Sequence, residues 1–424
     1  MSETVVLGAG LTGLGFGISF KDAVIYELCD KIGGHAKSVQ LAGFGFDQGA
    51  HIAHSKDKNW LNRICTAAGD VHQIHSSNVF NFWNGLQITY PVQNHLHELP
   101  LEYRTKALLD FFHSQYNKEE FQTNNYESWC LKQYGEYLTN TFYRPYTKKY
   151  WKEEMKALDT DWLGGRLLPA QIEKIIKGAL GPIPETQAVF STFHYPSSGG
   201  FGAFLTDMGN GLDIRLNKKA IHLDLANKVV SFTDGEKTNY DNLISTIPLT
   251  ELVDIISDVP KEIQEAREKL KHTQLCVVDI VLEGEQCTPA HWFYIYDVDM
   301  PAARVGVPSN LSGYEGTKTA LQAEIFFGQD EQVDLKSVQE KVISKLPTYL
   351  DISAAHIKQV QTRLIKYAYI VSNHDRKTAS KYILKWLEKH DIISTGLYGA
   401  WEYIWSDKAF ETGYVLGQEL RRNR

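Results

Sequence analysis

The stretch Thr4–Glu27, which reads TVVLGAGLTGLGFGISFKDAVIYE, decides the fold. Its first four residues predict a short buried strand, and Ala23–Glu27 predicts a second one. Between them lie a glycine-rich turn and a helix of small residues that runs to about Phe20. A Gly-x-Gly-x-x-Gly turn between a strand and a helix, followed by a second strand, is typical of a Rossmann-like dinucleotide-binding unit. The sequence therefore predicts an α/β fold built on a parallel sheet.

The three glycines of this turn have separate predicted roles. Gly8 permits the tight turn after the strand, Gly10 lets the backbone approach a pyrophosphate, and Gly13 lets the helix pack close to the sheet. The helix begins at Leu11 and Thr12, where free N–H groups and the helix dipole favour a phosphate. We therefore predict that these five residues bind the diphosphate of a dinucleotide.

Glu27 ends the second predicted strand, 19 residues after Gly8, and its carboxylate is placed to accept hydrogen bonds from a ribose. The simpler alternative is that the glycines make a turn and bind nothing. The fingerprint also leaves both NAD and FAD open as the dinucleotide.

The composition is that of a soluble globular protein. The chain has 424 residues, of which 43% are hydrophobic and 22% charged, so it can bury a large core. The net charge of −7 argues against a nucleic-acid partner, and no apolar run reaches the ~18 residues of a membrane span. The five cysteines include no CxxC pair, which argues against a disulfide framework and a metal site and fits a reducing cytoplasm.

Three further segments resemble flavoproteins of the amine-oxidase and protoporphyrinogen-oxidase superfamily. They are the Gly33-Gly34 pair within ELCDKIGGHAKSV, the stretch GFGFDQGAHIAH at 43–54, and LISTIP at 243–248. The resemblance implies that the dinucleotide is FAD rather than NAD.

The same resemblance implies roles for particular residues. Gly34 and His35 would lie along the FAD, and Thr246 would lie on the strand that returns to the FAD-binding domain. Either His51 or His54 would approach the flavin ring and respond to its redox state. The alternative for both histidines is a structural role in the loop.

Four segments resemble UDP-galactopyranose mutase and its relatives. They are GAHIAH at 49–54, PYTKKYW at 145–151, YPSSGGF at 195–201 and AWEYIWSD at 400–407, which ends in the cofactor-binding candidate Asp407. Mutases of this kind interconvert the pyranose and furanose rings of a nucleotide-diphosphate sugar. The reduced flavin is the nucleophile at the anomeric carbon, and there is no net redox change.

A diphosphate leaving group needs cations, and arginine provides them with a bidentate fork. By the mutase resemblance, Arg166 and Arg304 would bind the diphosphate and be essential to catalysis, together with His51 and His54. The alternative for each arginine is an ordinary surface position. The other residues that the resemblance implies for substrate binding are Tyr146, Trp151, Tyr369 and Tyr403.

The resemblance also predicts interleaved domains, with α+β content overall. Residues 1–90, 190–250 and 390–424 would form a Rossmann-like FAD-binding domain. Residues 91–189 would form a helical domain that caps the substrate, and residues 251–389 would form an antiparallel-sheet substrate domain. Apolar residues at three- and four-residue spacing support helices between about 97 and 190.

Two departures from the family pattern put the substrate in question. Leu397 stands in a glycine turn where relatives commonly carry arginine, and His35 stands where asparagine is frequent. We therefore predict a mutase-like enzyme for a different nucleotide sugar. It would need an external reductant, such as NAD(P)H or a reductase, and it could form a homodimer.

Two other functions remain open from the sequence. One is an FAD-dependent oxidoreductase of the amine-oxidase or desaturase kind, whose pocket would be largely apolar. The other is a non-catalytic binding protein on the same scaffold, which resembles the Rab escort proteins and GDP-dissociation inhibitors and would need no flavin.

Overall fold

The predicted β-α-β unit forms the centre of a five-stranded parallel sheet. The computed structural model describes residues 3–116, 124–164, 166–183, 192–284 and 286–422. In it, α1 (Leu11–Ser19) connects β1 (Thr4–Leu7) to β2 (Ala23–Tyr26), and these two strands pair in parallel. The full strand order is β19-β13-β1-β2-β9, with β9 (Asp213–Arg215), β13 (Asn242–Ser245) and β19 (Ile392–Ser394). The predicted α/β fold class is thereby confirmed.

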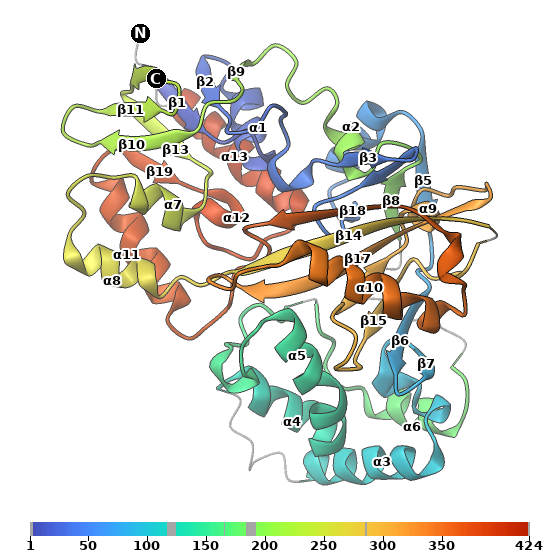
Figure 1. Cartoon of the computed structure of the whole chain (residues 1–424). Coiled ribbons are helices and arrows are strands. Elements are labelled where there is room, and N and C mark those ends of the chain that lie inside the picture. Colours follow the sequence, from blue (N-terminus) through green and yellow to red (C-terminus); the bar gives the residue numbers. More distant parts are fainter. Residues whose placement is uncertain (1–2, 117–123, 165, 184–191, 285, 423–424) are drawn as a thin grey trace.

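Helix α1 lies directly against the last helix of the chain, α13 (Ser406–Arg422), as Figure 1 shows. Glycines on both helices permit this close approach. A Cβ on Gly15 would lie 2.3 Å from the carbonyl oxygen of Phe410, and a Cβ on Gly413 would lie 1.9 Å from that of Thr12. The C-terminal helix therefore braces the helix whose N-terminus faces the predicted dinucleotide site.

A seven-stranded sheet forms the middle layer of the molecule (Figure 1). Its order is β18-β14-β17-β16-β15-β6-β7, and its long central pair runs antiparallel from Thr273↔Gly328 to Glu283↔Lys318. The strands are β6 (Val79–Trp83), β7 (Leu86–Thr89), β14 (Thr273–Glu283), β15 (Trp292–Ile295), β16 (Arg304–Gly306), β17 (Lys318–Gly328) and β18 (Ile357–Ile365).

Two strands that precede residue 90 belong to the seven-stranded sheet. Residues 79–89 form β6 and β7, and β6 pairs in parallel with β15 from Val79↔Trp292 to Phe82↔Ile295. These strands therefore extend the seven-stranded sheet rather than the parallel sheet. The sequence pattern of a short apolar strand cannot specify this, because either sheet would satisfy it.

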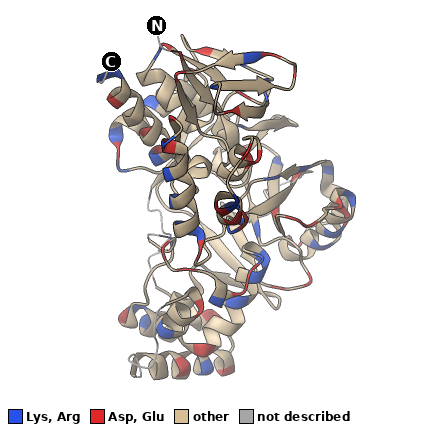
Figure 2. Cartoon of the chain, turned by 90° about the vertical axis from the view of Figure 1, so that its left-hand side faces the viewer, with Lys and Arg blue, Asp and Glu red and all other residues tan. Residues whose placement is uncertain are grey.

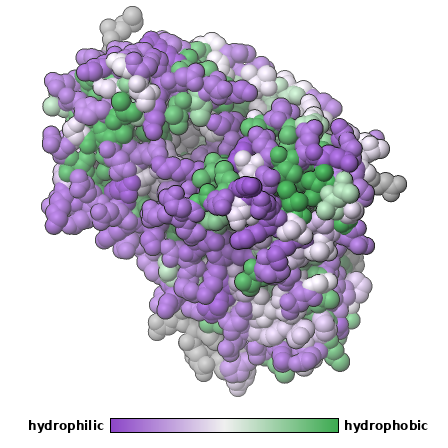
Figure 3. All heavy atoms as spheres, viewed as in Figure 1, coloured by the Kyte–Doolittle hydropathy of each residue, from purple (hydrophilic) through white to green (hydrophobic). Residues whose placement is uncertain are grey.

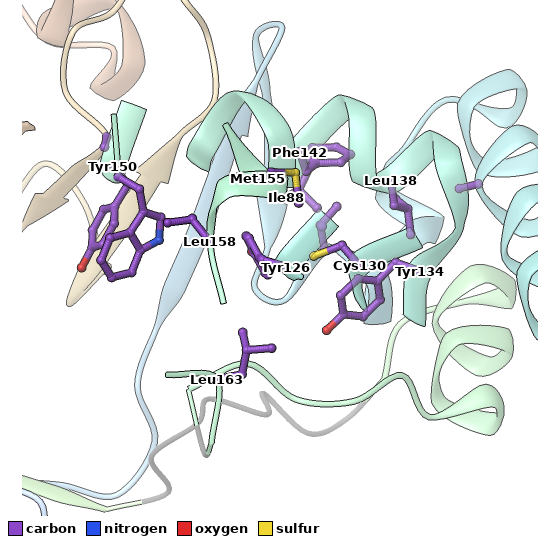
Figure 4. Close-up of a cluster of buried hydrophobic side chains, with 14 of the residues drawn as sticks. Ile88, Tyr126, Cys130, Tyr134, Leu138, Phe142, Tyr150, Met155, Leu158 and Leu163 are labelled. Atoms are coloured by element: carbon purple, nitrogen blue, oxygen red, sulfur yellow. The ribbon is translucent and has the colours of Figure 1, made fainter. Parts of the chain in front are cut away.

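Helices form a separate layer below the sheet in Figure 1. Its described helices are α3 (Leu101–Tyr116), α4 (Tyr126–Leu138), α5 (Arg144–Tyr150) and α6 (Ile172–Leu180). Figure 4 shows their shared core, in which Cys130, Tyr134 and Phe142 are fully buried. Helices therefore form in the region where the sequence predicts them. Residues 117–123, 165 and 184–191 of that region lie outside the described residues.

The other described elements connect or cover these layers. The remaining strands are β3 (Val39–Leu41), β4 (Phe44–Phe46), β5 (Val71–Ile74), β8 (Phe193–Pro196), β10 (Ala220–Asp224), β11 (Val229–Phe232) and β12 (Lys237–Asn239). The remaining α-helices are α2 (Lys58–Ala68), α7 (Leu249–Asp254), α8 (Lys261–Glu268), α9 (Pro308–Leu311), α10 (Leu335–Leu350), α11 (Arg376–Glu388) and α12 (Gly396–Gly399).

The surface carries both signs of charge. Figure 2 shows Lys and Arg interspersed with Asp and Glu over the face that it draws, and Figure 3 shows a mostly hydrophilic surface with scattered hydrophobic areas. Within the part of the chain that the structure describes, no helix combines the length and apolar character that crossing a bilayer requires.

A buried histidine makes the fold sensitive to acid. Burial lowers the pKa of His291 to about 4, and its Nδ1 accepts a hydrogen bond from the backbone N–H of Asn78 at 2.8 Å. Between pH 6.5 and pH 4 the unfolded state therefore binds more protons than the folded state. We expect the free energy of unfolding to fall by about 2 kcal/mol between pH 7 and pH 5 from this group.

Denaturant unfolding at the two pH values measures this loss. The His291→Gln variant should show a smaller difference between pH 7 and pH 5 than the unaltered chain. A His222→Gln variant, which changes an exposed side chain, is the control. An unchanged pH difference in His291→Gln would contradict the assignment.

Candidate active site

A cavity of about 1000 Å³ extends from the turn between β1 and α1 to helix α5 and the seven-stranded sheet. One end is lined by Gly8, Gly10 and Glu27, and the other end includes Tyr146 and Arg304. The cavity therefore joins the parallel sheet, the helical layer and the seven-stranded sheet.

The glycine turn is packed so closely that it leaves no space for a Cβ atom at Gly8 or Gly13. Gly8 has φ +99°, and a Cβ there would lie 2.5 Å from Thr246 Oγ1. A Cβ on Gly13 would lie 2.0 Å from the carbonyl oxygen of Gly8. Thr246 Oγ1 in turn donates to the carbonyl oxygen of Leu7 at 2.9 Å. This hydrogen bond connects the residue after strand β13 to the residue before the glycine turn. This packing fixes the position of the N-terminus of α1.

The second glycine pair lies against the first. Gly33 N–H donates to the carbonyl oxygen of Ala9 at 2.8 Å, and Gly10 forms an isolated parallel bridge with Gly33. A Cβ on Gly34, where φ is +55°, would approach Gly10 Cα to 3.1 Å. Two motifs that are separate in the sequence thus form one backbone-lined groove.

Two features of this groove suit a nucleotide. The Glu27 carboxylate accepts hydrogen bonds from the backbone N–H groups of Ala9 at 2.7 Å and Cys29 at 2.9 Å, which hold it at the cavity wall with acceptor capacity to spare. The first turn of α1 has no acidic side chain, and its N-cap Gly10 makes no side-chain cap. Its N–H groups are therefore available to an anion.

Arg304 occupies the opposite end of the cavity on strand β16. Its Nε and Nη2 donate to Glu324 Oε2 at 3.0 and 2.7 Å, and the Glu324 side chain is fully buried on the neighbouring strand β17. Burial opposes the charge of Arg304, but the Glu324 carboxylate holds the pKa of the guanidinium well above its usual value. Arg304 is thus a permanent cation in the cavity wall.

Arg166 reaches the same end of the cavity from the loop after α5. Its guanidinium carbon lies 4.1 Å from the ring centre of Tyr403 and 4.5 Å from that of Trp405. Burial lowers the pKa of Arg166, although the group remains a cation near neutral pH. Tyr150 and Tyr369 lie near both Arg166 and Arg304, and all four side chains line the same cavity.

Many aromatic side chains also line this cavity. Trp151 lies 5.9 Å from Tyr369 and 6.1 Å from Tyr403, measured between ring centres, and Tyr369 stacks on Tyr403 at 5.7 Å. Burial raises the pKa of Tyr90, Tyr146, Tyr150 and Tyr403 well above its usual value, so these four remain neutral hydroxyls.

The family model described as "Flavin containing amine oxidoreductase" matches residues 10–286, which is more than half of the chain. The chain belongs to the flavin-containing amine oxidoreductase family.

Solved structures agree on the fold. The crystal structure of reduced UDP-galactopyranose mutase matches with a TM-score of 0.92 at 23% sequence identity, over 100% of this chain and 96% of the other. A protein from Exiguobacterium sp. 255-15 that is assigned as a protoporphyrinogen oxidase matches with a TM-score of 0.75 at 14% identity, over 100% and 99%. A CLA-producing fatty acid isomerase from P. acnes matches with a TM-score of 0.64 at 14% identity, over 100% and 98%.

FAD is the cofactor of this member of the family, and the groove fits it. The glycine cradle accepts no Cβ at Gly8 or Gly13, which leaves room for a pyrophosphate against backbone N–H groups. The residues that would hold it are those that line this end of the cavity: Gly8, Gly10, Leu11, Thr12, Glu27, Gly34, His35, His51 and Thr246.

Three predicted residues are not among the described residues that line the cavity. Gly13 packs behind the turn, against the carbonyl oxygen of Gly8. His54 is not among the described residues that line the cavity, and its Nδ1 lies 2.9 Å from the carbonyl oxygen of Thr192. Asp407 is also absent from that lining, and its Oδ2 accepts a hydrogen bond from Ser55 at 2.5 Å. His54 therefore connects the loop after His51 to Thr192, and Asp407 binds Ser55 of the same loop. His51 itself lines the cavity, with Nδ1 2.9 Å from the carbonyl oxygen of Gly49.

The departures from the family pattern are both in the cavity wall. Leu397 lines it in α12, next to Gly396, where a Cβ would lie 2.4 Å from Thr12 Oγ1. The His35 ring nitrogen Nε2 lies 2.5 Å from the carbonyl oxygen of Tyr367, and burial lowers the pKa of His35 to about 4. His35 is therefore neutral at pH 7, and neither departure supplies a positive charge.

Sequence reasoning missed several residues of the site. Glu324 is the most informative, because it binds Arg304 through Oε2 and accepts the backbone N–H of Ala50 through Oε1 at 2.6 Å. It thereby connects the arginine to the loop that carries His51. A signal existed, since Glu324 is the single charge in the apolar run ALQAEIFF. Gln93, Tyr150, Tyr294 and Tyr296 also line the cavity, and no pattern in the sequence distinguishes them from core residues.

Proposed function

We propose that this protein is an FAD-dependent isomerase that interconverts the pyranose and furanose forms of a nucleotide-diphosphate sugar. The observation that carries the proposal is the pair of arginines, Arg166 and Arg304. They come from separate parts of the chain, both line the cavity that begins at the glycine turn, and Tyr150 and Tyr369 lie near each of them. A diphosphate needs such cations, whereas an apolar amine does not.

Reduced FAD supplies a nucleophile at the anomeric carbon, and the reaction has no net redox change. The side chains have complementary tasks. Arg166 and Arg304 bind the diphosphate and stabilise it as it leaves, because guanidinium groups pair with phosphate oxygens in a bidentate manner. The hydroxyls of Tyr369 and Tyr403 donate to the same oxygens. Trp151 lines the sugar and excludes water.

The nucleoside of the substrate would lie between helix α5 and the segment that follows strand β7. Tyr146 lines this region and packs at 5.3 to 5.7 Å from Tyr150, Tyr294 and Tyr296, measured between ring centres. Gln93 is 5% exposed, and its Oε1 accepts a hydrogen bond from Tyr143 at 3.1 Å. That bond orients the Gln93 amide, so its N–H groups can donate to an acceptor on the base.

Turnover in defined redox states tests the proposal. The protein is purified with FAD, reduced with dithionite, and incubated without oxygen with a panel of nucleotide-diphosphate sugars, while furanose products are followed by chromatography. We expect turnover with the reduced protein and none with the oxidised protein. An external reductant, such as NAD(P)H, should support the same activity.

The competing function is an FAD-dependent oxidoreductase, which the family and the aromatic cavity wall favour. It predicts that a substrate bleaches the oxidised flavin and that no nucleotide sugar reacts in either redox state. That result would refute the isomerase proposal.

A further inference from the structure

The loop that carries Arg166 is fastened at its base to the chain just before α11. Asp159 N–H donates to the carbonyl oxygen of Ser372 at 2.7 Å, and Leu158 forms an antiparallel bridge with Asn373. His374 Nε2 lies 3.0 Å from the carbonyl oxygen of Lys156. This backbone pairing brings the side chain of Asp161 to the N-terminus of α11.

Asp161 and Arg376 form the centre of this junction. The Asp161 carboxylate accepts hydrogen bonds from Ser372 Oγ on one oxygen and from Arg376 Nη2 on the other. The two side chains are only 11% and 8% exposed. Arg376 Nη1 donates to the carbonyl oxygen of Trp401 at 2.8 Å. Arg376 therefore connects the loop that leads to Arg166 with the loop that leads to Tyr403.

Trp401 holds that second loop in an unusual conformation. Its φ is +56°, and its side chain is fully buried. A non-glycine residue persists in this left-handed region only where its surroundings impose it. The buried ring and the hydrogen bond from Arg376 to its carbonyl oxygen provide such surroundings. The turn at Trp401 leads directly to Tyr403 and Trp405.

These two rings enclose Arg166. Its guanidinium carbon lies 4.1 and 4.5 Å from the two ring centres, and its Nη2 donates to the carbonyl oxygen of Tyr403 at 3.2 Å. The geometry of the Arg166 site thus depends on two loops that meet at Arg376.

We propose that the Asp161–Arg376 pair is a positioning device that holds Arg166 and Tyr403 in place for a diphosphate. The inference rests on the proposed function, because the diphosphate is the ligand that the two residues would bind. Two effects follow from the pairing. Fixing the two loops in advance lowers the entropic cost of binding. Asp161 is five residues before Arg166. Because Arg376 pairs with the Asp161 carboxylate, that carboxylate does not compete with the ligand for Arg166.

The test measures UDP binding to the FAD-loaded protein by titration calorimetry. Arg376→Gln should raise the Kd for UDP by roughly tenfold, with the FAD content and the flavin absorbance spectrum unchanged. Arg376→Lys should recover part of the affinity. The matched control is Lys377→Ala. Lys377 Nζ also lies 3.3 Å from the same Asp161 oxygen, but this side chain is 63% exposed. We expect its Kd to stay within about twofold of the unaltered chain.

A double-mutant cycle separates positioning from general stability. In the Arg166→Ala background, Arg376→Gln should have a clearly smaller further effect on the Kd, because one of the two residues it positions is gone. Equal effects in both backgrounds would overturn the inference. If Arg376→Gln loses FAD, Asp161→Asn tests the same link, since it keeps the shape of the side chain and removes its charge.

The results also distinguish this inference from the proposed function. If the unaltered protein does not bind UDP or any other nucleoside diphosphate in the panel, the proposed function fails. If it binds UDP and both Arg376→Gln and Asp161→Asn bind equally well, only the positioning role fails.

Discussion

An Arg304→Ala variant is expected to lose about 100- to 1000-fold in kcat/KM for the nucleotide-sugar substrate, or about 3 to 4 kcal/mol of transition-state stabilisation. Arg304 is a buried cation whose charge no other residue of β16 can replace, because the rest of that strand reads Val305-Gly306. Part of the loss arises from the protein alone, since the variant leaves the buried Glu324 without its cationic partner. Steady-state kinetics with the reduced protein and UDP titrations measure the effect.

A second buried arginine on the same sheet provides the control. Arg363 on β18 donates to Asp279, whose side chain is fully buried, with a distance of 2.9 Å from Nε to Oδ2. Arg363 does not line the cavity in the described part of the chain. Arg363→Ala should therefore lower the thermal stability much as Arg304→Ala does, with no selective loss of UDP affinity.

The double variant Arg304→Ala, Glu324→Gln removes the buried carboxylate charge as well. It should recover stability and leave UDP binding weak. If UDP bound equally well to Arg304→Ala and to the unaltered protein, the assignment of Arg304 to the diphosphate would be wrong.

A Gly13→Ala variant is expected to lose FAD during purification and to give a nearly colourless protein. The added Cβ would lie 2.0 Å from the carbonyl oxygen of Gly8 and 3.1 Å from its carbonyl carbon. These are backbone atoms, so a rotamer change cannot relieve the overlap and the N-terminus of α1 must move. Overpacking costs about 1 to 3 kcal/mol. The displaced N–H groups at the N-terminus of α1 are also those that would face the pyrophosphate. We therefore expect the FAD affinity to fall by about tenfold to hundredfold.

The ratio of flavin to protein absorbance after gel filtration measures this loss, and FAD titration of the stripped protein gives the affinity. Gly181→Ala is the matched control, because a Cβ there meets no atom within 4 Å and its φ of 178° suits any residue. Retention of one FAD per chain in Gly13→Ala would show that the glycine turn does not hold the cofactor.

Local patterns determined much of the fold in advance. The Gly8–Gly13 turn sits between a strand and a helix as predicted, since glycine spacing and a strand–turn–helix context express steric limits that act within a few residues. The helices α3 to α6 also lie within the stretch where apolar residues recur at three- and four-residue spacing. The cavity residues Tyr146, Trp151, Arg166, Arg304, Tyr369 and Tyr403 were found through a family resemblance, because no local pattern assigns a ligand to an isolated arginine or tyrosine.

Only the tertiary structure decided how these residues meet. The sequence by itself determined that a β-α-β unit with a dinucleotide turn exists, because that unit is encoded within 24 consecutive residues. It did not determine that β6 and β7 join the seven-stranded sheet, that Glu324 holds Arg304, or that Arg376 connects Asp161 to Trp401. Each of these depends on contacts between residues far apart in the chain. Such contacts arise when distant strands pair and when buried charges find partners in the complete fold. The spacing of residues within a short segment does not predict them.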